Sequence, residues 1–204
     1  MTLDTVHDVQ HAYRKLVQAT SFPGTIVSIS HEAQKIDLPT ELPRPLLLLA
    51  MMLLDAEVAF SIDSQHAERD ASLISRVTYS REVSRSQAAF VLVANPEQAT
   101  EAIRDARVGT LTDPHLGATV VLLVETLREV EPGEAVADDV PTFELAGPGV
   151  QSTRRIAVGA PADWMEARAR QNAEYPLGID ALFVTRDGAL LSLPRTTQVS
   201  RVEG

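Results

Sequence analysis

Short runs of β-branched residues, separated by helical segments, constrain the fold of this chain more than any other feature. Thr119 to Val124 reads TVVLLV, with five apolar residues after Thr119, and Phe90 to Ala94 reads FVLVA, which is apolar throughout. Strands of this kind are buried on both faces, as in a mostly parallel sheet with helices on either side. We therefore predict an α/β fold in three layers, with a mainly parallel mixed sheet covered by helices.

Other segments fit this scheme. Residues 5–20 place Val6, Val9, Tyr13, Leu16 and Val17 at helical spacing, and a Pro-Gly turn follows. The run Leu46 to Leu54 contains no β-branched residue, which favours a buried helix. Residues 181–185 and 189–193 flank Arg186-Asp187-Gly188 and indicate a β-hairpin. The remaining expected elements are strands at 25–30, 58–62, 143–146 and 155–158 and helices at about 64–76, 96–106 and 162–174.

The stretch from Glu125 to Asp139 differs from its surroundings. It is acidic and contains Pro132-Gly133, so we interpret it as an exposed connection. No segment is rich enough in Pro, Gly or Ser to indicate a linker between domains. Residues 1–204 are therefore expected to form a single domain.

The charge and composition exclude several classes of partner. The formal net charge is −10, which disfavours binding to a nucleic acid backbone. The chain has no cysteine, so disulfides and thiolate chemistry are excluded. The longest apolar run has nine residues, Leu46 to Leu54, whereas a membrane helix needs about 20. No secretory signal is recognisable at the start, and we expect a cytoplasmic protein with neither membrane nor nucleic acid as a partner.

No motif identifies a catalytic centre. The phosphate-binding patterns GxxxxGK[ST] and GxGxxG are missing, as is the GxSxG nucleophile pattern. His7 and His11 are four residues apart, but the segment HDVQH lacks a glutamate and a nearby third ligand, so we favour solvent-facing histidines over a metal site. Asp113 and His115 could share a proton, but such a pair more often shapes a turn.

The C-terminal third contains the candidate ligand- or partner-binding residues. The segment Tyr175 to Asp180 turns at Gly178 and places an acid directly before an apolar strand. Arg195, Thr196 and Thr197 follow the hairpin, where a guanidinium beside two hydroxyls could bind phosphate or carboxylate. An ion pair between Arg195 and Asp180 that holds the hairpin is equally consistent with the spacing.

A Gly-Pro-Gly segment adds two further candidates. Gly147 and Gly149 bracket Pro148 at the end of a predicted strand. Glycines in this arrangement allow unusual backbone angles or close backbone approach. We favour a tight turn, with a ligand or partner pressed against the backbone as the alternative.

Several segments resemble motifs of the PhnH family and occur in the same order as in that family. Its members are subunits of the carbon–phosphorus lyase, with which bacteria use alkylphosphonates as a phosphorus source. Each segment is weak evidence alone, but the ordered set spans nearly the whole chain. The segments are Tyr13-Arg14, Ser21-Phe22-Pro23-Gly24, Pro96-Glu97-Gln98-Ala99-Thr100, Gly109-Thr110, Pro114, Gly117-Ala118-Thr119, Gly147-Pro148-Gly149, YPLGID at 175–180 and LPRTT at 193–197.

The resemblance implies a fold similar to the large domain of type I pyridoxal-phosphate (PLP) transferases, without PLP. A Schiff base needs a lysine, and Lys15 and Lys35, both near the start of the chain, do not follow a late strand. The resemblance also implies that the complex uses MgATP, and that this chain itself binds no cofactor.

The resemblance further implies a step in which a phosphonate displaces adenine from MgATP to give α-D-ribose 1-phosphonate 5-triphosphate. The implied partners are a second copy of the chain and the subunits PhnG, PhnI, PhnJ and PhnL. We favour a scaffolding role, since no nucleophile, metal cluster or phosphate loop is recognisable. In the alternative, Arg195, Thr196, Thr197 and Asp180 contribute to a shared active site that binds phosphate or nucleotide.

Overall fold

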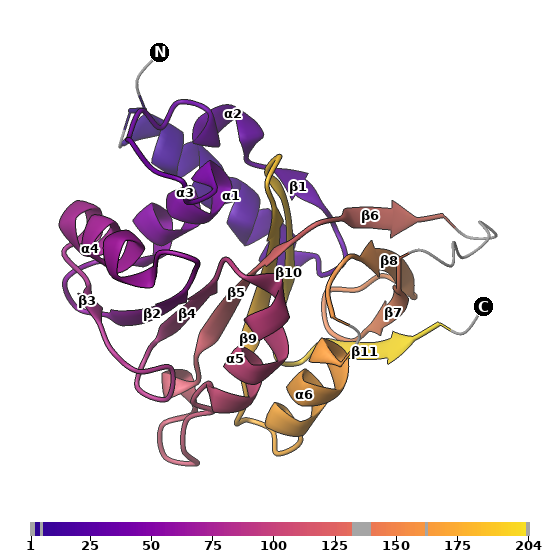
Figure 1. Ribbon diagram of the computed structural model, residues 1–204. Helices are drawn as coiled ribbons and strands as arrows, with labels where there is room; N and C mark the ends of the chain where they lie inside the picture. Colours follow the sequence, from indigo (N-terminus) through magenta and orange to yellow (C-terminus); the bar gives the residue numbers. More distant parts are fainter. Residues whose placement is uncertain (1–2, 5, 132–139, 162, 203–204) are drawn as a thin grey trace.

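Two β-sheets organise the computed structural model, which describes residues 3–4, 6–131, 140–161 and 163–202 (Figure 1). Within these residues the larger sheet has the strand order β1-β10-β9-β5-β4-β2-β3. Its bounds are β1 (Val27–Ser28), β2 (Ala59–Asp63), β3 (Arg81–Glu82), β4 (Phe90–Val93), β5 (Thr119–Val124), β9 (Asp180–Thr185) and β10 (Ala189–Leu193). Neighbours from β9 to β3 pair in parallel, while β10 and β1 pair antiparallel. The predicted α/β fold with a mainly parallel mixed sheet is thus confirmed.

Helices cover both faces of this sheet. On one face lie α1 (His7–Ser21), α2 (Ser30–Ala33), α3 (Arg44–Leu53) and α4 (Ala67–Thr78), and on the other lie α5 (Ala99–Asp105) and α6 (Trp164–Gln171). Strand β5 alternates between the two layers. Val121 and Leu123 join the core beneath α1–α4, and Val120, Leu122 and Val124 join the core on the opposite side.

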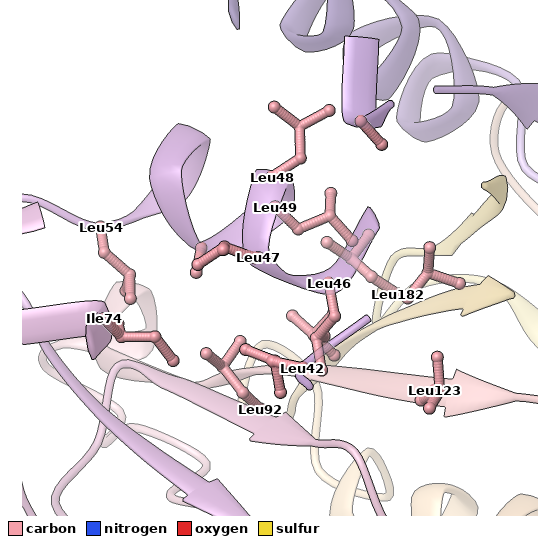
Figure 2. Close-up of a cluster of buried hydrophobic side chains, with 14 of the residues drawn as sticks. Leu42, Leu46, Leu47, Leu48, Leu49, Leu54, Ile74, Leu92, Leu123 and Leu182 are labelled. Atoms are coloured by element: carbon pink, nitrogen blue, oxygen red, sulfur yellow. The ribbon is translucent and has the colours of Figure 1, made fainter. Parts of the chain in front are cut away.

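Helix α3 forms the centre of the first core. Leu46, Leu47, Leu48 and Leu49 are all fully buried, and burying each leucine side chain contributes about 2 kcal/mol. Figure 2 shows this leucine cluster together with Leu92, Leu123 and Leu182 of the sheet. The helix predicted from the missing β-branched residues is therefore confirmed. None of the helices in the described ranges has the length and hydropathy needed to cross a membrane.

The second, smaller sheet was not predicted. It is antiparallel, with the order β11-β7-β8-β6, and packs on the α5–α6 side of the large sheet. Its bounds are β6 (Leu127–Val130), β7 (Thr142–Ala146), β8 (Arg154–Val158) and β11 (Gln198–Arg201). The interpretation of 125–139 as an exposed connection is wrong for its first part, because β6 pairs with β8 and buries Val130. Residues 132–139, with the predicted Pro132-Gly133 turn, lie outside the described residues.

Two other expectations need correction at the N-terminal end. The helix over 5–20 is present as α1, but its buried face consists of Ala12, Leu16 and Ala19, whereas Tyr13 and Val17 are about half exposed. Small alanines allow α1 to approach its neighbours closely, so the face is set by size as well as by hydropathy. The strand expected at 25–30 is reduced to β1, because the chain turns into α2 at residue 30.

Ion pairs fasten α1 to the segment around α2. Lys15 Nζ lies 2.8 Å from both carboxylate oxygens of Glu32, whose side chain is 3% exposed. Lys35 Nζ lies 2.7 Å from Asp8 Oδ1. Burial by itself raises the pKa of Glu32, but the hydrogen bond and charge of Lys15 outweigh it, so this pKa lies below its usual value.

Because the pKa of Glu32 is lowered in the folded state, the stabilisation by the Lys15–Glu32 ion pair depends on pH. Its contribution is fully present above the ordinary glutamate pKa near 4.5 and is lost as the pH falls through the lower folded-state value. We expect Glu32→Gln to reduce the free energy of unfolding at pH 7 by about 1–2 kcal/mol and to flatten its decline between about pH 5 and 3. Urea unfolding across this range measures both effects.

The exposed Glu57 provides the matched control. Glu57→Gln removes the same charge without changing the Lys15–Glu32 ion pair. The pH dependence of its free energy of unfolding should therefore follow that of the unmodified chain. If Glu32→Gln and Glu57→Gln show the same pH dependence, the Lys15–Glu32 pair does not contribute to acid stability.

Candidate functional site

Arg195 is the centre of the C-terminal candidate site. It follows β10, and its backbone N–H donates to Asp180 Oδ1 over 2.7 Å. Its Nη2 donates to Asp180 Oδ2 over 2.8 Å, and its Nε lies 3.5 Å from Oδ1. The two side chains are 16% and 34% exposed. The ion pair considered from the sequence is thus formed, and it fixes the end of β10 to the start of β9.

The same guanidinium reaches two other segments. Arg195 Nη1 donates to the carbonyl oxygens of Pro114, over 2.9 Å, and Pro176, over 3.3 Å. Pro114 begins the 3₁₀ turn η2 (Pro114–Leu116) before β5, and Pro176 follows a cis peptide bond after α6. All three guanidinium nitrogens therefore donate to protein acceptors. We call Arg195, Asp180, Pro114 and Pro176 the arginine hub.

Glycines allow the backbone to close around this hub. Gly117 has a φ of −58°, which any residue adopts, but a Cβ there would overlap the carbonyl oxygen of Gly178 and lie 2.8 Å from Arg195 Nη1. Gly178 has a φ of +138°, and a Cβ there would overlap the side chain of Asn172. Asn172 Oδ1 accepts the N–H of Ile179 over 2.7 Å. Close packing therefore explains both glycines.

A second arginine, which we did not single out from the sequence, lies beside the hub. Arg168 of α6 is 3% exposed and donates to the carbonyl oxygens of Thr197, over 3.1 Å, and Pro194, over 2.6 Å. Burial lowers its pKa to about 10, against the opposing charge of Asp180. The sequence did contain a signal, because Arg168 lies four residues after Trp164 and shares its buried helix face.

The two threonines differ in environment. Thr196 is exposed, whereas Thr197 is 3% exposed and its Oγ1 is buried without a hydrogen-bond partner among the described residues. Gly147 packs against them, since a Cβ there would lie 2.9 Å from the Thr196 carbonyl oxygen. Gly149 instead packs against Ser21, at the end of α1, and Pro23, in the turn that follows. The structure thus gathers the predicted residues around the hub, except for Gly149.

A pocket of about 580 Å³ opens beside the hub. We call it the hairpin pocket. Arg168, Asn172, Arg195, Thr196 and Thr197 contribute its polar side, and no acidic residue is among the described residues that line it. The pocket offers hydrogen-bond donors and hydroxyls, and the described part of its lining has no carboxylate or imidazole that could act as a general base.

The other candidates do not assemble into a site. His7 Nδ1 lies 3.0 Å from Asp4 Oδ2 at the start of α1, and His11 and His115 are exposed. Among the described residues, no group of three or more His, Asp or Glu side chains could hold a metal ion. The arginine hub with its pocket is therefore the main feature at this end of the chain.

The fold and the hub define a class of protein: an α/β domain with an antiparallel subsheet, in which a partly buried arginine locks the C-terminal hairpin. The model of the family described as "Bacterial phosphonate metabolism protein (PhnH)" matches residues 2–200. The putative C-P lyase subunit protein HtxG of Stutzerimonas stutzeri is 33% identical over 192 residues, which cover 94% of this chain and 85% of that protein. The chain belongs to the PhnH family, as its sequence motifs predicted.

The hub geometry predicts a large effect for loss of Arg195. Arg195→Ala removes the charged donor from Asp180 Oδ2 and the donor from two carbonyl oxygens in a partly buried setting, and leaves Asp180 only the backbone N–H at Oδ1. We expect the free energy of unfolding to fall by about 2–3 kcal/mol, measured by urea unfolding.

Arg201→Ala is the control, because Arg201 is exposed on β11 and carries the same charge. Its loss should change stability by less than about 0.5 kcal/mol. Equal effects of the two substitutions would show that the hub does not stabilise the fold.

Proposed function

We propose that this chain is a subunit of a carbon–phosphorus lyase. Family membership over residues 2–200 and the name of its relative, a putative C-P lyase subunit protein, support this role. The step we assign is the displacement of adenine from MgATP by a phosphonate, which gives α-D-ribose 1-phosphonate 5-triphosphate. The proposed partners are a second copy of the chain and the PhnG, PhnI, PhnJ and PhnL subunits, in the cytoplasm.

We favour a scaffolding role over a catalytic one within this assembly. The observation that carries this choice is the state of Arg195, whose three guanidinium nitrogens all donate to protein acceptors. Stabilising a cationic sugar or a departing base requires groups aimed at the substrate. An arginine held by Asp180 and two carbonyl oxygens supports the backbone instead.

The hairpin pocket supports the alternative, in which the chain contributes to a shared active site. Thr196 is exposed at its rim, and Arg195 and Thr197 line it. The donors of the pocket would suit an anionic group of a ligand shared with another subunit. Asp180 would then hold Arg195 in position.

We also propose that the fold is similar to that of the large domain of type I PLP transferases. The parallel order β9-β5-β4-β2-β3 with helices on both faces supports it. The lysines do not fit PLP chemistry, because Lys15 and Lys35 lie near α1 and α2 and form ion pairs with Glu32 and Asp8. We therefore propose no PLP-dependent reaction step for this chain.

Co-purification tests membership of the complex. The tagged chain is expressed in its host with an alkylphosphonate as the phosphorus source and isolated without added salt. We expect the four named subunits to co-purify in fixed proportion, as identified by mass spectrometry. Isolation of the chain without any of them would overturn the proposal.

Thr196→Ala separates the scaffold from the shared active site. Because Thr196 is exposed, its hydroxyl can be removed without disturbing the hub. A scaffold predicts intact assembly and phosphonate-dependent adenine release within about twofold of the unmodified complex, since surface substitutions change stability little. Thr153→Ala, at another exposed threonine, is the matched control.

A loss of adenine release of about tenfold or more in Thr196→Ala alone, with assembly intact, would favour the alternative. Such a loss in both variants would instead point to a general effect of surface threonines on the complex.

A further inference from the structure

The large sheet changes winding direction between β2 and β4. From β2 the chain passes through α4 to β3 on one side, and from β4 it passes through α5 to β5 on the other. Helices α4 and α5 accordingly pack on opposite faces. In open α/β sheets, ligands bind outside the carboxyl ends of the strands at such a switch point.

Three pockets lie along this carboxyl edge. One, of about 370 Å³, lies between the segments that follow β2 and β4 and is lined by residues 64–66 and 94–97. A second, of about 480 Å³, lies at the end of β5, and a third, of about 260 Å³, lies between α2, α3 and the hairpin tip. Arg186, at the tip of the β9–β10 hairpin, lines all three. We call the three pockets together the carboxyl-edge crevice.

The third pocket has an excess of positive charge. Arg44 and Arg186 both line it, and Asp187 is the acidic residue among its described lining residues. Neither guanidinium has a hydrogen bond or an ion pair with any described residue, whereas the Asp187 carboxylate accepts a hydrogen bond from Thr185. Two unpaired arginines thus converge on one pocket in a chain with a net charge of −10.

The first pocket, which shares Arg186 with the third, is more acidic. Glu41, Asp70 and Glu97 line the first pocket. Glu41 Oε2 lies 3.2 Å from His66 Nε2, and Asp70 accepts a hydrogen bond from Ser64 over 2.6 Å. The crevice therefore combines two arginines at the third pocket with carboxylate acceptors at the first pocket, near the switch point.

We propose that Arg44 and Arg186 bind the tetrahedral oxyanion of a small phosphate or phosphonate compound. A carboxylate can be satisfied by one guanidinium fork, whereas a tetrahedral group has three oxygens and can accept from two forks on separate elements. The carboxylates of the first pocket would accept hydrogen bonds from the rest of a longer ligand. This site lies at the edge opposite the arginine hub, and it does not depend on the scaffolding role.

Calorimetric titration of the purified full chain tests the site, with methylphosphonate, inorganic phosphate, MgATP and acetate as probes at low salt. We expect saturable binding of at least one phosphorus compound and not of acetate. Arg186→Gln and Arg44→Gln should each weaken binding by at least about tenfold. Arg201→Gln, which removes an exposed arginine elsewhere, should leave binding within about twofold.

The probes also distinguish the source of the oxyanion. Tighter binding of methylphosphonate than of phosphate identifies a phosphonate site, and tighter binding of MgATP identifies a nucleotide that occupies the whole crevice. No saturable binding up to about 10 mM, equal binding of acetate, or an equal loss in Arg201→Gln would each overturn the inference. Thermal unfolding of every variant confirms that it is folded. If the chain binds a phosphorus compound but fails to co-purify with the four subunits, the site holds and the proposed function fails.

Discussion

The interaction between Arg195 and Asp180 is the one on which the C-terminal half of the molecule depends. It joins the start of β9 to the end of β10, and through Pro114 and Pro176 it also fixes the turns before β5 and after α6. Strand β11, at the edge of the small sheet, begins three residues after Arg195. The hub and Arg168 therefore fix the segment that leads into β11, while the apolar contact of Phe143 with Trp164 packs the small sheet against α6.

The parts of the fold that could be predicted are those whose signal is local. The mostly apolar β5 and the leucine-rich α3 indicate their burial within a few consecutive residues, and the β9–β10 hairpin has a short turn with glycine. Strands β6 and β11 are short and carry charged residues, and their pairing joins distant segments, as when Gln198 lies opposite Ala146. Their stability comes from that pairing and not from local preference, so the sequence pattern alone could not reveal the small sheet.

The candidate site follows the same division. Residue types identified Arg195 and Asp180 as candidates. An anion-binding site and an Arg195–Asp180 ion pair were equally consistent with the sequence, because spacing along the chain does not fix which donors meet which acceptors. The contact between Gly117 and Gly178 joins residues 61 positions apart, and only the folded chain shows that Gly117 makes room for the guanidinium of Arg195 and Gly178 for the side chain of Asn172. Arg168 was overlooked because an arginine on an apolar helix face usually buries only its aliphatic stem and keeps its guanidinium in water.

The two edges of the large sheet have different physical characters. At the amino ends of β5 and β9, the guanidinium nitrogens of Arg195 all donate to protein acceptors, and closely packed glycines bring the surrounding backbone segments together. At the carboxyl ends, Arg44 and Arg186 have no partner among the described residues, and pockets surround them. A satisfied donor gains little from a new ligand, because it must first give up an existing hydrogen bond. An exposed guanidinium without a protein partner gives up only hydrogen bonds to water, so Arg44 and Arg186 are better placed than Arg195 to bind a ligand.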